Sequence, residues 1–304
     1  MPEEQEPAPD DTPARRRISR RALIGGAIGV VAVAAVGGGG AVVLPRLLKG
    51  TEDGLLVPDL VKRAGFTVAH RGGSRDWPEM SLEGYRNSVA LGVNALEMSL
   101  ARTSDGVWFG LHDATLDRTS GTSGFVAADH TWAEVQRYRI TAAETDRPKQ
   151  APQPYLRFED LVEAYGTTHT IFVDPKVVPT MHLGELFTLM AKVENPTRTF
   201  VAKGYCTAQA WPVDARARGY QTWGYYYGRE LTADPELYAK TQARWTWLGL
   251  DYQGGEAAWA QFTATGKPVL AHIVPSRAAA DSALRLGANG MVVSGVQEVL
   301  KGAS

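Results

Sequence analysis

The sequence predicts an α/β fold, a closed (β/α)8 TIM barrel, and three observations support this prediction. Short β-rich runs alternate with segments of helical spacing over most of the 304 residues. Alternation of this kind requires a parallel sheet covered by helices. Eight such units in roughly 250 residues are enough to close a barrel. The composition, with 44% hydrophobic and 21% charged residues, is sufficient for a packed core.

The predicted strands follow one another at intervals filled by helices. They cover residues 67–70, 94–98, 170–174, 199–203, 220–225, 246–250, 268–272 and 290–293. Helical spacing is clear in residues 81–91, 158–165, 182–193, 235–242 and 277–286. A ninth run, 107–111, follows the second strand closely, and we expect it to pair with a neighbour. Residues 114–156 are only partly helical, so we expect a small insertion over one mouth of the barrel.

A doubly wound open sheet is the alternative architecture. It would need a glycine-rich phosphate loop directly after the first strand. The residues at that point, Arg71-Gly72-Gly73-Ser74, do not carry the G-x-G-x-x-G pattern. The closed barrel is therefore the favoured prediction.

The first 64 residues differ in composition from the predicted barrel, which covers residues 65–304. Residues 1–21 are rich in proline, acidic residues and arginine, which predicts a disordered cytoplasmic tail. Residues 22–45 contain no charge and are long enough to cross a hydrocarbon core as a transmembrane or signal segment. Residues 46–64 are then a linker. Because arginines precede the apolar run, the positive-inside rule places the barrel outside the cytoplasm.

The basic residues before the apolar run also resemble an export signal. The string Ser19-Arg20-Arg21-Ala22-Leu23-Ile24 resembles a twin-arginine signal, although an arginine-flanked anchor would need no special pathway. No Ala-x-Ala sequence closes the run convincingly, and no cysteine follows it for lipidation. We therefore expect a single-pass protein of the cell membrane with an extracytoplasmic barrel, or export by the twin-arginine route.

Charge and cysteine content exclude several classes of protein. The chain has 32 basic and 33 acidic residues, and this balance gives no electrostatic footprint for nucleic acid. The single cysteine, Cys206, excludes an internal disulfide and a cysteine-based zinc cluster.

Polar side chains gather at the ends of the predicted strands, where a (β/α)8 barrel carries its reacting groups. They are His70, Arg71, Glu97, His112, Asp113, Asp174, Lys176, Lys203, Asp251 and His272. This grouping suits attack on a phosphodiester, whose transition state gathers negative charge on the non-bridging oxygens. Arg71 and Lys176 are predicted to clamp those oxygens. One histidine would remove a proton from the attacking hydroxyl, and the other would protonate the leaving oxygen.

Several of these residues stand in a recognisable order. The stretches are Ala69-His70-Arg71-Gly72-Gly73, Pro78-Glu79, Ala95-Leu96-Glu97, Thr103-Ser104-Asp105-Gly106, Leu111-His112-Asp113 and Leu116-Asp117-Arg118-Thr119. Together they resemble the glycerophosphodiester phosphodiesterase family, within the phosphatidylinositol-phospholipase-C-like phosphodiesterase superfamily. Weaker matches follow at 154–161, 174–176, 267–270 and 286–290.

The resemblance implies metal-dependent hydrolysis of glycerophosphodiesters to glycerol 3-phosphate and an alcohol. His70 would be the general base that deprotonates the glycerol hydroxyl next to the phosphate. That hydroxyl would attack phosphorus to give a cyclic phosphate, which water then opens. His112 would protonate the departing alcohol. Arg71 and Lys176 would bind the phosphate, and Lys203 is a further phosphate-binding candidate.

The resemblance also implies a divalent metal, Mg²⁺ or Ca²⁺, held by Glu97 and Asp174. The family pattern at the second strand is Glu-x-Asp, with both residues ligating metal, whereas this chain has Glu97-Met98-Ser99. Because affinity for Ca²⁺ follows the number of charged ligands, the serine predicts weaker metal binding. Three compensations stay open: Glu79 or Asp113 as a further ligand, or Lys203 in part of the cation's role.

Two alternatives to an active glycerophosphodiesterase remain. One is a barrel that binds phosphodiesters without turnover, because Ser99 has disrupted the metal site. The other is a sphingomyelinase D-like phospholipid hydrolase, which would need an open apolar mouth. Retention of both histidines, Arg71 and Lys176 favours activity. The expected partners are a small glycerophosphodiester or an envelope glycerol-phosphate substrate, and the membrane through the N-terminal segment, with no nucleic acid.

Overall fold

The computed structural model describes residues 53–141 and 150–301. The predicted tail 1–21, with its twin arginines, and the predicted membrane or signal segment 22–45 lie outside these residues. The same is true of the linker before residue 53. Within the described ranges, no helix is both long enough and apolar enough to cross a membrane.

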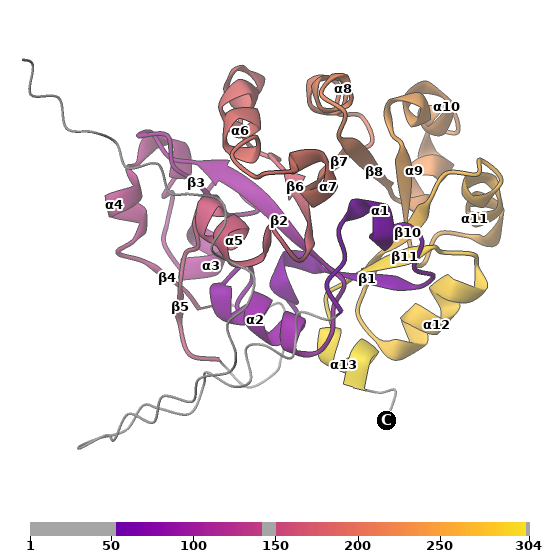
Figure 1. The fold of residues 1–304 in the computed structure, drawn as a ribbon, viewed down its shortest axis with the longest axis horizontal. Helices are drawn as coiled ribbons and strands as arrows, with labels where there is room; N and C mark the ends of the chain where they lie inside the picture. Colours follow the sequence, from indigo (N-terminus) through magenta and orange to yellow (C-terminus); the bar gives the residue numbers. More distant parts are fainter. Residues whose placement is uncertain (1–52, 142–149, 302–304) are drawn as a thin grey trace, which may run out of the picture. The chain divides into compact units, whose positions relative to one another are not determined.

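Eight parallel strands close into a barrel (Figure 1). Each strand pairs with the next, and β11 returns to pair with β1. The barrel strands are β1 (Phe66–Ala69), β2 (Ala95–Arg102), β6 (Thr170–Asp174), β7 (Phe200–Tyr205), β8 (Gln221–Tyr226), β9 (Trp247–Asp251), β10 (Val269–Val274) and β11 (Gly290–Val293). They correspond in order to the eight predicted strands, which confirms the predicted closed barrel.

Helices follow the strands and surround them in Figure 1. The α-helices outside the insertion are α1 (Val57–Leu60), α2 (Leu82–Ala90), α5 (Phe158–Tyr165), α6 (Leu183–Met190), α7 (Pro196–Thr199), α8 (Ala210–Ala217), α9 (Gly228–Ala233), α10 (Leu237–Thr241), α11 (Glu256–Thr263), α12 (Arg277–Arg285) and α13 (Val296–Lys301). Short 3-10 turns occur at His70–Gly72, Thr180–His182 and Gln242–Arg244. Ser81 caps α2 by accepting a hydrogen bond from the Gly84 N–H at 3.0 Å.

The interior of the barrel is apolar along most of its depth. Inward side chains alternate with outward ones along each strand, and they form a single cluster: Phe66, Val68, Ala95, Phe172, Val201, Trp223, Tyr225, Trp247, Leu270 and Val292. Gly249 makes room for this packing, because a Cβ there would lie 2.5 Å from the Trp223 ring. At the carboxyl ends of the strands, the same alternation turns polar residues inward, including Glu97 and Lys203. The apolar cluster thus closes the barrel beneath a polar rim.

The chain leaves the barrel after β2 for a small insertion. The predicted ninth run forms β3 (Trp108–Gly110), which pairs antiparallel with β2. The insertion continues through α3 (Asp117–Ser120), a 3-10 turn (Ala127–Asp129), α4 (Trp132–Val135), β4 (Arg139–Ile140) and β5 (Gln153–Pro154). Phe109, Leu116, Val135 and Tyr155 belong to an apolar cluster separate from the barrel core. The predicted insertion is therefore confirmed, and it has a small core of its own.

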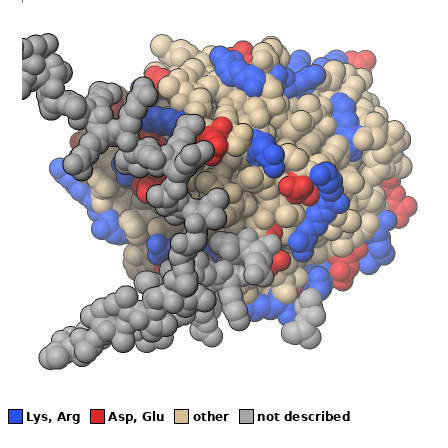
Figure 2. Space-filling view, in the orientation of Figure 1, with Lys and Arg blue, Asp and Glu red and all other residues tan. Residues whose placement is uncertain are grey.

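Charges of both signs are interspersed over the face drawn in Figure 2. This mixture is in keeping with the formal net charge of −1.

Candidate active site

The turn after β1 carries the first histidine and the arginine. β1 ends at Ala69, and the backbone then enters the left-handed region, with φ of 47° at Arg71 and 74° at Gly72. A non-glycine residue in this region is held by its surroundings and is typical of functional sites. Here the N–H of Arg71 donates to Oε2 of Glu97 at 2.7 Å. This hydrogen bond ties the turn to β2.

His70 is buried and suited to accept a proton. Its Nδ1 lies 3.3 Å from Oγ of Ser74, which leaves Nε2 for chemistry in the pocket. Burial, and then the charge of Arg71, lower the pKa of His70 well below its usual value. The imidazole is therefore neutral at pH 7 and can act as a base.

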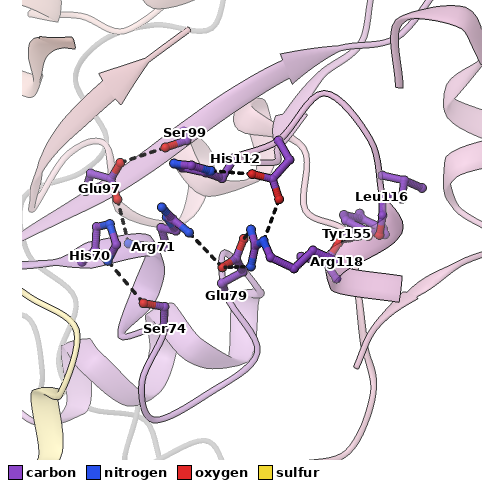
Figure 3. Close-up of polar contacts among 12 residues, drawn as sticks. His70, Arg71, Ser74, Glu79, Glu97, Ser99, His112, Leu116, Arg118 and Tyr155 are labelled. Atoms are coloured by element: carbon purple, nitrogen blue, oxygen red, sulfur yellow. Dashed lines mark hydrogen bonds and ion pairs between the residues drawn. The ribbon is translucent and has the colours of Figure 1, made fainter. Parts of the chain in front are cut away.

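His112 follows β3 and is oriented through a series of hydrogen bonds and ion pairs, drawn as dashed lines in Figure 3. Its Nδ1 lies 2.7 Å from Asp113 Oδ1, and Asp113 Oδ2 accepts from Arg118 Nε at 2.6 Å. Arg118 also pairs with both oxygens of Glu79, at 2.7 and 3.0 Å. We call Asp113, Arg118 and Glu79 the outer chain. Because Nδ1 of His112 is engaged, Nε2 is the nitrogen left for a reacting group.

The pKa of His112 reflects two opposing influences. Burial, followed by the charge of Arg71, lowers the pKa below its usual value. The hydrogen bond to Asp113 works in the opposite direction and retains part of the basicity. His112 therefore keeps more proton affinity than His70, as the acid member of an acid–base pair should.

Glu97, Asp174 and Lys203 form a second group of charges, which we call the inner cluster. The ammonium of Lys203 donates to Glu97 Oε1 at 2.8 Å and to Asp174 Oδ2 at 3.0 Å. Ser99 stands opposite Asp174 in the sheet register and donates to Glu97 Oε1 at 3.2 Å. The three charged side chains are buried, with exposures of 0 to 7%. They are therefore screened only weakly by solvent.

The pKa values in the inner cluster follow from its charges. Burial alone would raise the pKa of Glu97, but Lys203, His70 and Arg71 outweigh it and hold the pKa far below the usual value. Burial alone would lower the pKa of Lys203, but Asp174 and Glu97 hold it well above the usual value. Glu97 is therefore a carboxylate and Lys203 an ammonium over the whole physiological pH range.

The residues present do not fit the predicted Mg²⁺ or Ca²⁺ site. The space between Glu97 and Asp174 holds the Lys203 ammonium, and the neighbouring ligand position is the neutral Ser99. Glu79 instead pairs with Arg71 at 3.1 Å and with Arg118, so its carboxylate is engaged by two guanidinium groups. Among residues 53–141 and 150–301, no three His, Cys, Asp or Glu side chains are placed to hold a metal ion. Glu97, Asp174 and Glu79 are therefore not assembled as a metal-binding trio in this structure.

Lys176 lies in the turn after β6 and faces the site with Tyr225. Its ammonium donates to the Tyr225 hydroxyl at 2.9 Å. The same ring lies 5.1 Å from the Lys203 ammonium and 5.4 Å from that of Lys176, both within range of a cation–π contact. Burial lowers the pKa of Lys176. Tyr225 therefore separates two lysine ammoniums that point toward one pocket.

The pocket lies at the carboxyl ends of the strands. Its walls are His70, Arg71, His112, Lys176, Lys203, Trp223, Tyr225, Tyr227, His272, Ile273 and Val292. Both predicted catalytic histidines and the three predicted phosphate-binding residues therefore border one cavity. Asp174 borders a neighbouring cavity that shares Lys176, Tyr225 and Tyr227 with the first. A pocket with cationic and aromatic walls suits a small anion with an organic part.

Two other rim residues are hydrogen-bonded to the backbone. His272 lines the pocket, but its Nε2 is 2.9 Å from the Tyr226 carbonyl, and burial lowers its pKa to about 3. Asp251 accepts a hydrogen bond from the Gly228 N–H at 2.7 Å. A location at a strand end did not by itself distinguish these residues from catalytic ones.

Three residues that hold side chains of the site were not among the predicted site residues. Ser74, Arg118 and Tyr225 hold His70, Asp113 and Lys176 respectively. Arg118 stands in one of the motifs that carry the family resemblance, but its partners are 5 and 39 residues away in the chain. Arg118 had a signal in its motif, and Tyr225 had one in the strand alternation that puts it on the same face as Tyr227; Ser74 had none.

The fold and the site together define a class, the (β/α)8 barrels with a cationic pocket at the carboxyl ends of their strands. Residues 70–199 match the model of the glycerophosphoryl diester phosphodiesterase family. Over these residues the chain is similar to this family.

Individual relatives show the same similarity over part of the chain. The chain is 37% identical over 111 residues to glycerophosphodiester phosphodiesterase 1 of Rattus norvegicus, a match that covers 36% of this chain and 33% of that protein. The chain spans less than half the length of the curated relatives that it matches.

Solved structures share the fold. A putative glycerophosphoryl diester phosphodiesterase of Silicibacter pomeroyi superposes with a TM-score of 0.63 at 19% identity, covering 85% of this chain and 98% of that one. A phosphodiesterase of Oleispira antarctica, in complex with the product sn-glycerol-3-phosphate, gives a TM-score of 0.61 at 14% identity and covers 79% and 97%.

Proposed function

We propose that the protein hydrolyses glycerophosphodiesters to glycerol 3-phosphate and an alcohol. The observation that carries this proposal is that the two predicted catalytic imidazoles, one guanidinium and two ammoniums border a single pocket, which His272 also lines. A phosphodiester carries one negative charge, and its transition state places more charge on the phosphoryl oxygens. Preorganised cations around that position stabilise the transition state more than the ground state.

In the first step, Nε2 of His70 takes the proton of the glycerol hydroxyl beside the phosphate. That oxygen forms a bond to phosphorus, the bond from phosphorus to the alcohol oxygen breaks, and His112 gives its proton to the departing oxygen. Arg71 and Lys176 hold the phosphoryl oxygens. The low pKa of His70 and the retained basicity of His112 support these roles.

In the second step, water opens the cyclic phosphate with the two proton transfers reversed. His112 removes a proton from water, the new bond from oxygen to phosphorus forms, and the ring oxygen leaves with the proton held by His70. The sum is one diester and one water giving one glycerol phosphate and one alcohol. Both histidines return to their starting states.

The direct test is release of glycerol 3-phosphate from glycerophosphocholine. His70→Ala should lower the rate by about 10²- to 10⁴-fold, the usual contribution of a positioned acid or base. His182→Ala is the matched control, because His182 lies in a turn after β6 and pairs with Glu185 at 2.9 Å. Equal rates for the two variants would contradict the assignment.

The rival functions are outcomes of the same assay. Binding of glycerophosphocholine without turnover would identify a phosphodiester-binding barrel. Release of choline from sphingomyelin, with no action on deacylated substrates, would identify a sphingomyelinase D-like hydrolase. Tyr225 and Tyr227 give the pocket aromatic walls. The two measurements decide between the phosphodiester-binding barrel and the sphingomyelinase D-like hydrolase.

The N-terminal sequence supports a proposal for the location of the barrel. We propose that residues 22–45 hold the barrel outside the cytoplasm, as a membrane anchor or after export by the twin-arginine route. Arginines before an uncharged run of this length support the proposal. Protease accessibility of the barrel in intact cells measures the outcome, and full protection would contradict it.

A further inference from the structure

The inner cluster lies where a divalent cation would be expected, between two carboxylates at the carboxyl ends of β2 and β6. The cation present is the ammonium of Lys203, which β7 supplies from within the barrel. Its side chain is 7% exposed, so no solvent layer separates it from the carboxylates. A metal ion would need the same oxygens at 2.0 to about 2.6 Å and would have to displace this ammonium.

The inner cluster has the same net charge that a metal-loaded site with three carboxylates would have. Glu97, Asp174 and Lys203 sum to one negative charge. A version with an aspartate at position 99 and a divalent ion in place of the ammonium would have the same sum. Ser99 and Lys203 therefore compensate each other. Compared with an aspartate, Ser99 carries one negative charge fewer, and compared with a divalent ion, the Lys203 ammonium carries one positive charge fewer.

Lys203 also retains a donor for the substrate. An ammonium has three hydrogens, and among the described residues two of them bind Glu97 and Asp174. Lys203 borders the pocket beside His70 and Arg71, so its third hydrogen is available there. A lysine ammonium is a compact point charge, as a metal ion is.

We propose that Lys203 takes the place of the catalytic divalent cation, so that this enzyme cleaves phosphodiesters without a metal ion. The inference rests on the proposed phosphodiesterase function and specifies how its negative charge is stabilised. Lys203 contacts a phosphoryl oxygen or the attacking glycerol oxygen through its third hydrogen. Glu97 and Asp174 hold the ammonium in position.

The first arm of the test uses the full chain without substitution. After dialysis against chelator, hydrolysis of glycerophosphocholine should stay within twofold, and added Mg²⁺, Ca²⁺ or Mn²⁺ should not raise it further. Loss of tenfold or more in chelator, with recovery on adding one of these ions, would overturn the inference and leave the proposed function intact. Absence of turnover under every condition would instead reject the proposed function, and the second arm then decides the inference.

The second arm measures metal binding by calorimetry and does not depend on turnover. The unsubstituted protein should show no saturable site for Mg²⁺, Ca²⁺ or Mn²⁺ at millimolar concentrations. The double variant Ser99→Asp/Lys203→Met should acquire a saturable site, because a third carboxylate appears where the ammonium is lost. Its dissociation constant should be at least tenfold lower than that of any metal binding by the unsubstituted protein. A saturable site in the unsubstituted protein that Glu97→Gln removes would overturn the inference, even if the double variant fails to fold.

A second lysine provides the matched control. Lys176→Met also removes a pocket ammonium, but the hydrogen bond of that ammonium goes to Tyr225. Combined with Ser99→Asp, it should create no metal site as tight as that of the Lys203→Met combination. Equal affinities in the two double variants would show that position 203 has no special part and would contradict the proposal.

Discussion

The inner cluster and the outer chain lie on the same rim of the barrel and use the same type of ion pair, but they differ in burial and in geometry. In the inner cluster, one ammonium serves two carboxylates, and all three side chains are at most 7% exposed. In the outer chain, the Arg118 guanidinium binds Glu79 with two nitrogens and is 41% exposed. The cation is thus a point charge in one case and a planar fork in the other.

This difference separates two tasks. The inner cluster keeps a positive charge in a site shielded from water, where electrostatic interactions are strong and an unpaired charge is costly. The outer chain connects Glu79 to Asp113 and so orients His112, which requires direction more than charge. We therefore expect the two networks to respond differently to substitution.

The largest effect is expected from Lys203→Met. Removing one partner of a buried ion pair strands the others, so the free energy of unfolding should fall by about 3 to 5 kcal/mol. Urea denaturation measures this change. The surface pair of Lys192 with Glu159, exposed by 63 and 49%, is the control, and Lys192→Met should cost no more than about 1 kcal/mol. Similar losses for both variants would remove the distinction between the networks.

Arg118→Met should mainly affect catalysis. Without the guanidinium, Asp113 and His112 lose their fixed direction, and we expect kcat to fall about tenfold or more while KM changes little. Arg118→Lys should not restore the rate, because an ammonium cannot bind the Glu79 carboxylate with two nitrogens and reach Asp113 as well. Steady-state kinetics on glycerophosphocholine provide the measurement. Full rescue by lysine would mean that charge alone matters in the outer chain.

The pH dependence tests the connection between the outer chain and His112. His112 must be protonated to serve as the acid, and its pKa is below the usual 6.5, so kcat/KM should decline with rising pH through a midpoint below 6.5. The acid limb belongs to His70, whose pKa is lowered further and which must be neutral. Asp113→Asn removes a contact that raises the pKa of His112. The alkaline limb should then move to lower pH by about half a unit to one unit, and a shift to higher pH would contradict the role of Asp113.

The smallest effect is expected from Ser99→Ala. The serine donates to Glu97 at 3.2 Å, but Lys203 and the Arg71 N–H already satisfy that carboxylate at shorter distances. The free energy of unfolding should change by about 1 kcal/mol or less. The rate of hydrolysis should stay within about threefold. A tenfold loss of activity would show that Ser99 contacts the substrate and does not merely fill the position of a ligand.

Local patterns in the sequence predicted the barrel and much of the site. β-rich runs alternating with helices predict a parallel sheet, and in the closed barrel the strand ends, and with them His70 and Lys176, converge on one rim. The motif order also identified the two histidines before any geometry was known. These features depend on neighbours in the chain and on one general rule of barrel topology.

Only the tertiary structure decided what the carboxylates bind. Lys203 and Glu97 are 106 residues apart, and Glu79 meets Arg118 across 39 residues. Whether such groups face a metal, a guanidinium or an ammonium depends on strand register and on the direction of each side chain. A shift of one residue would turn Lys203 out of the barrel. The sequence by itself therefore determined which charges lie on the rim, and the register of β2, β6 and β7 determined their pairing.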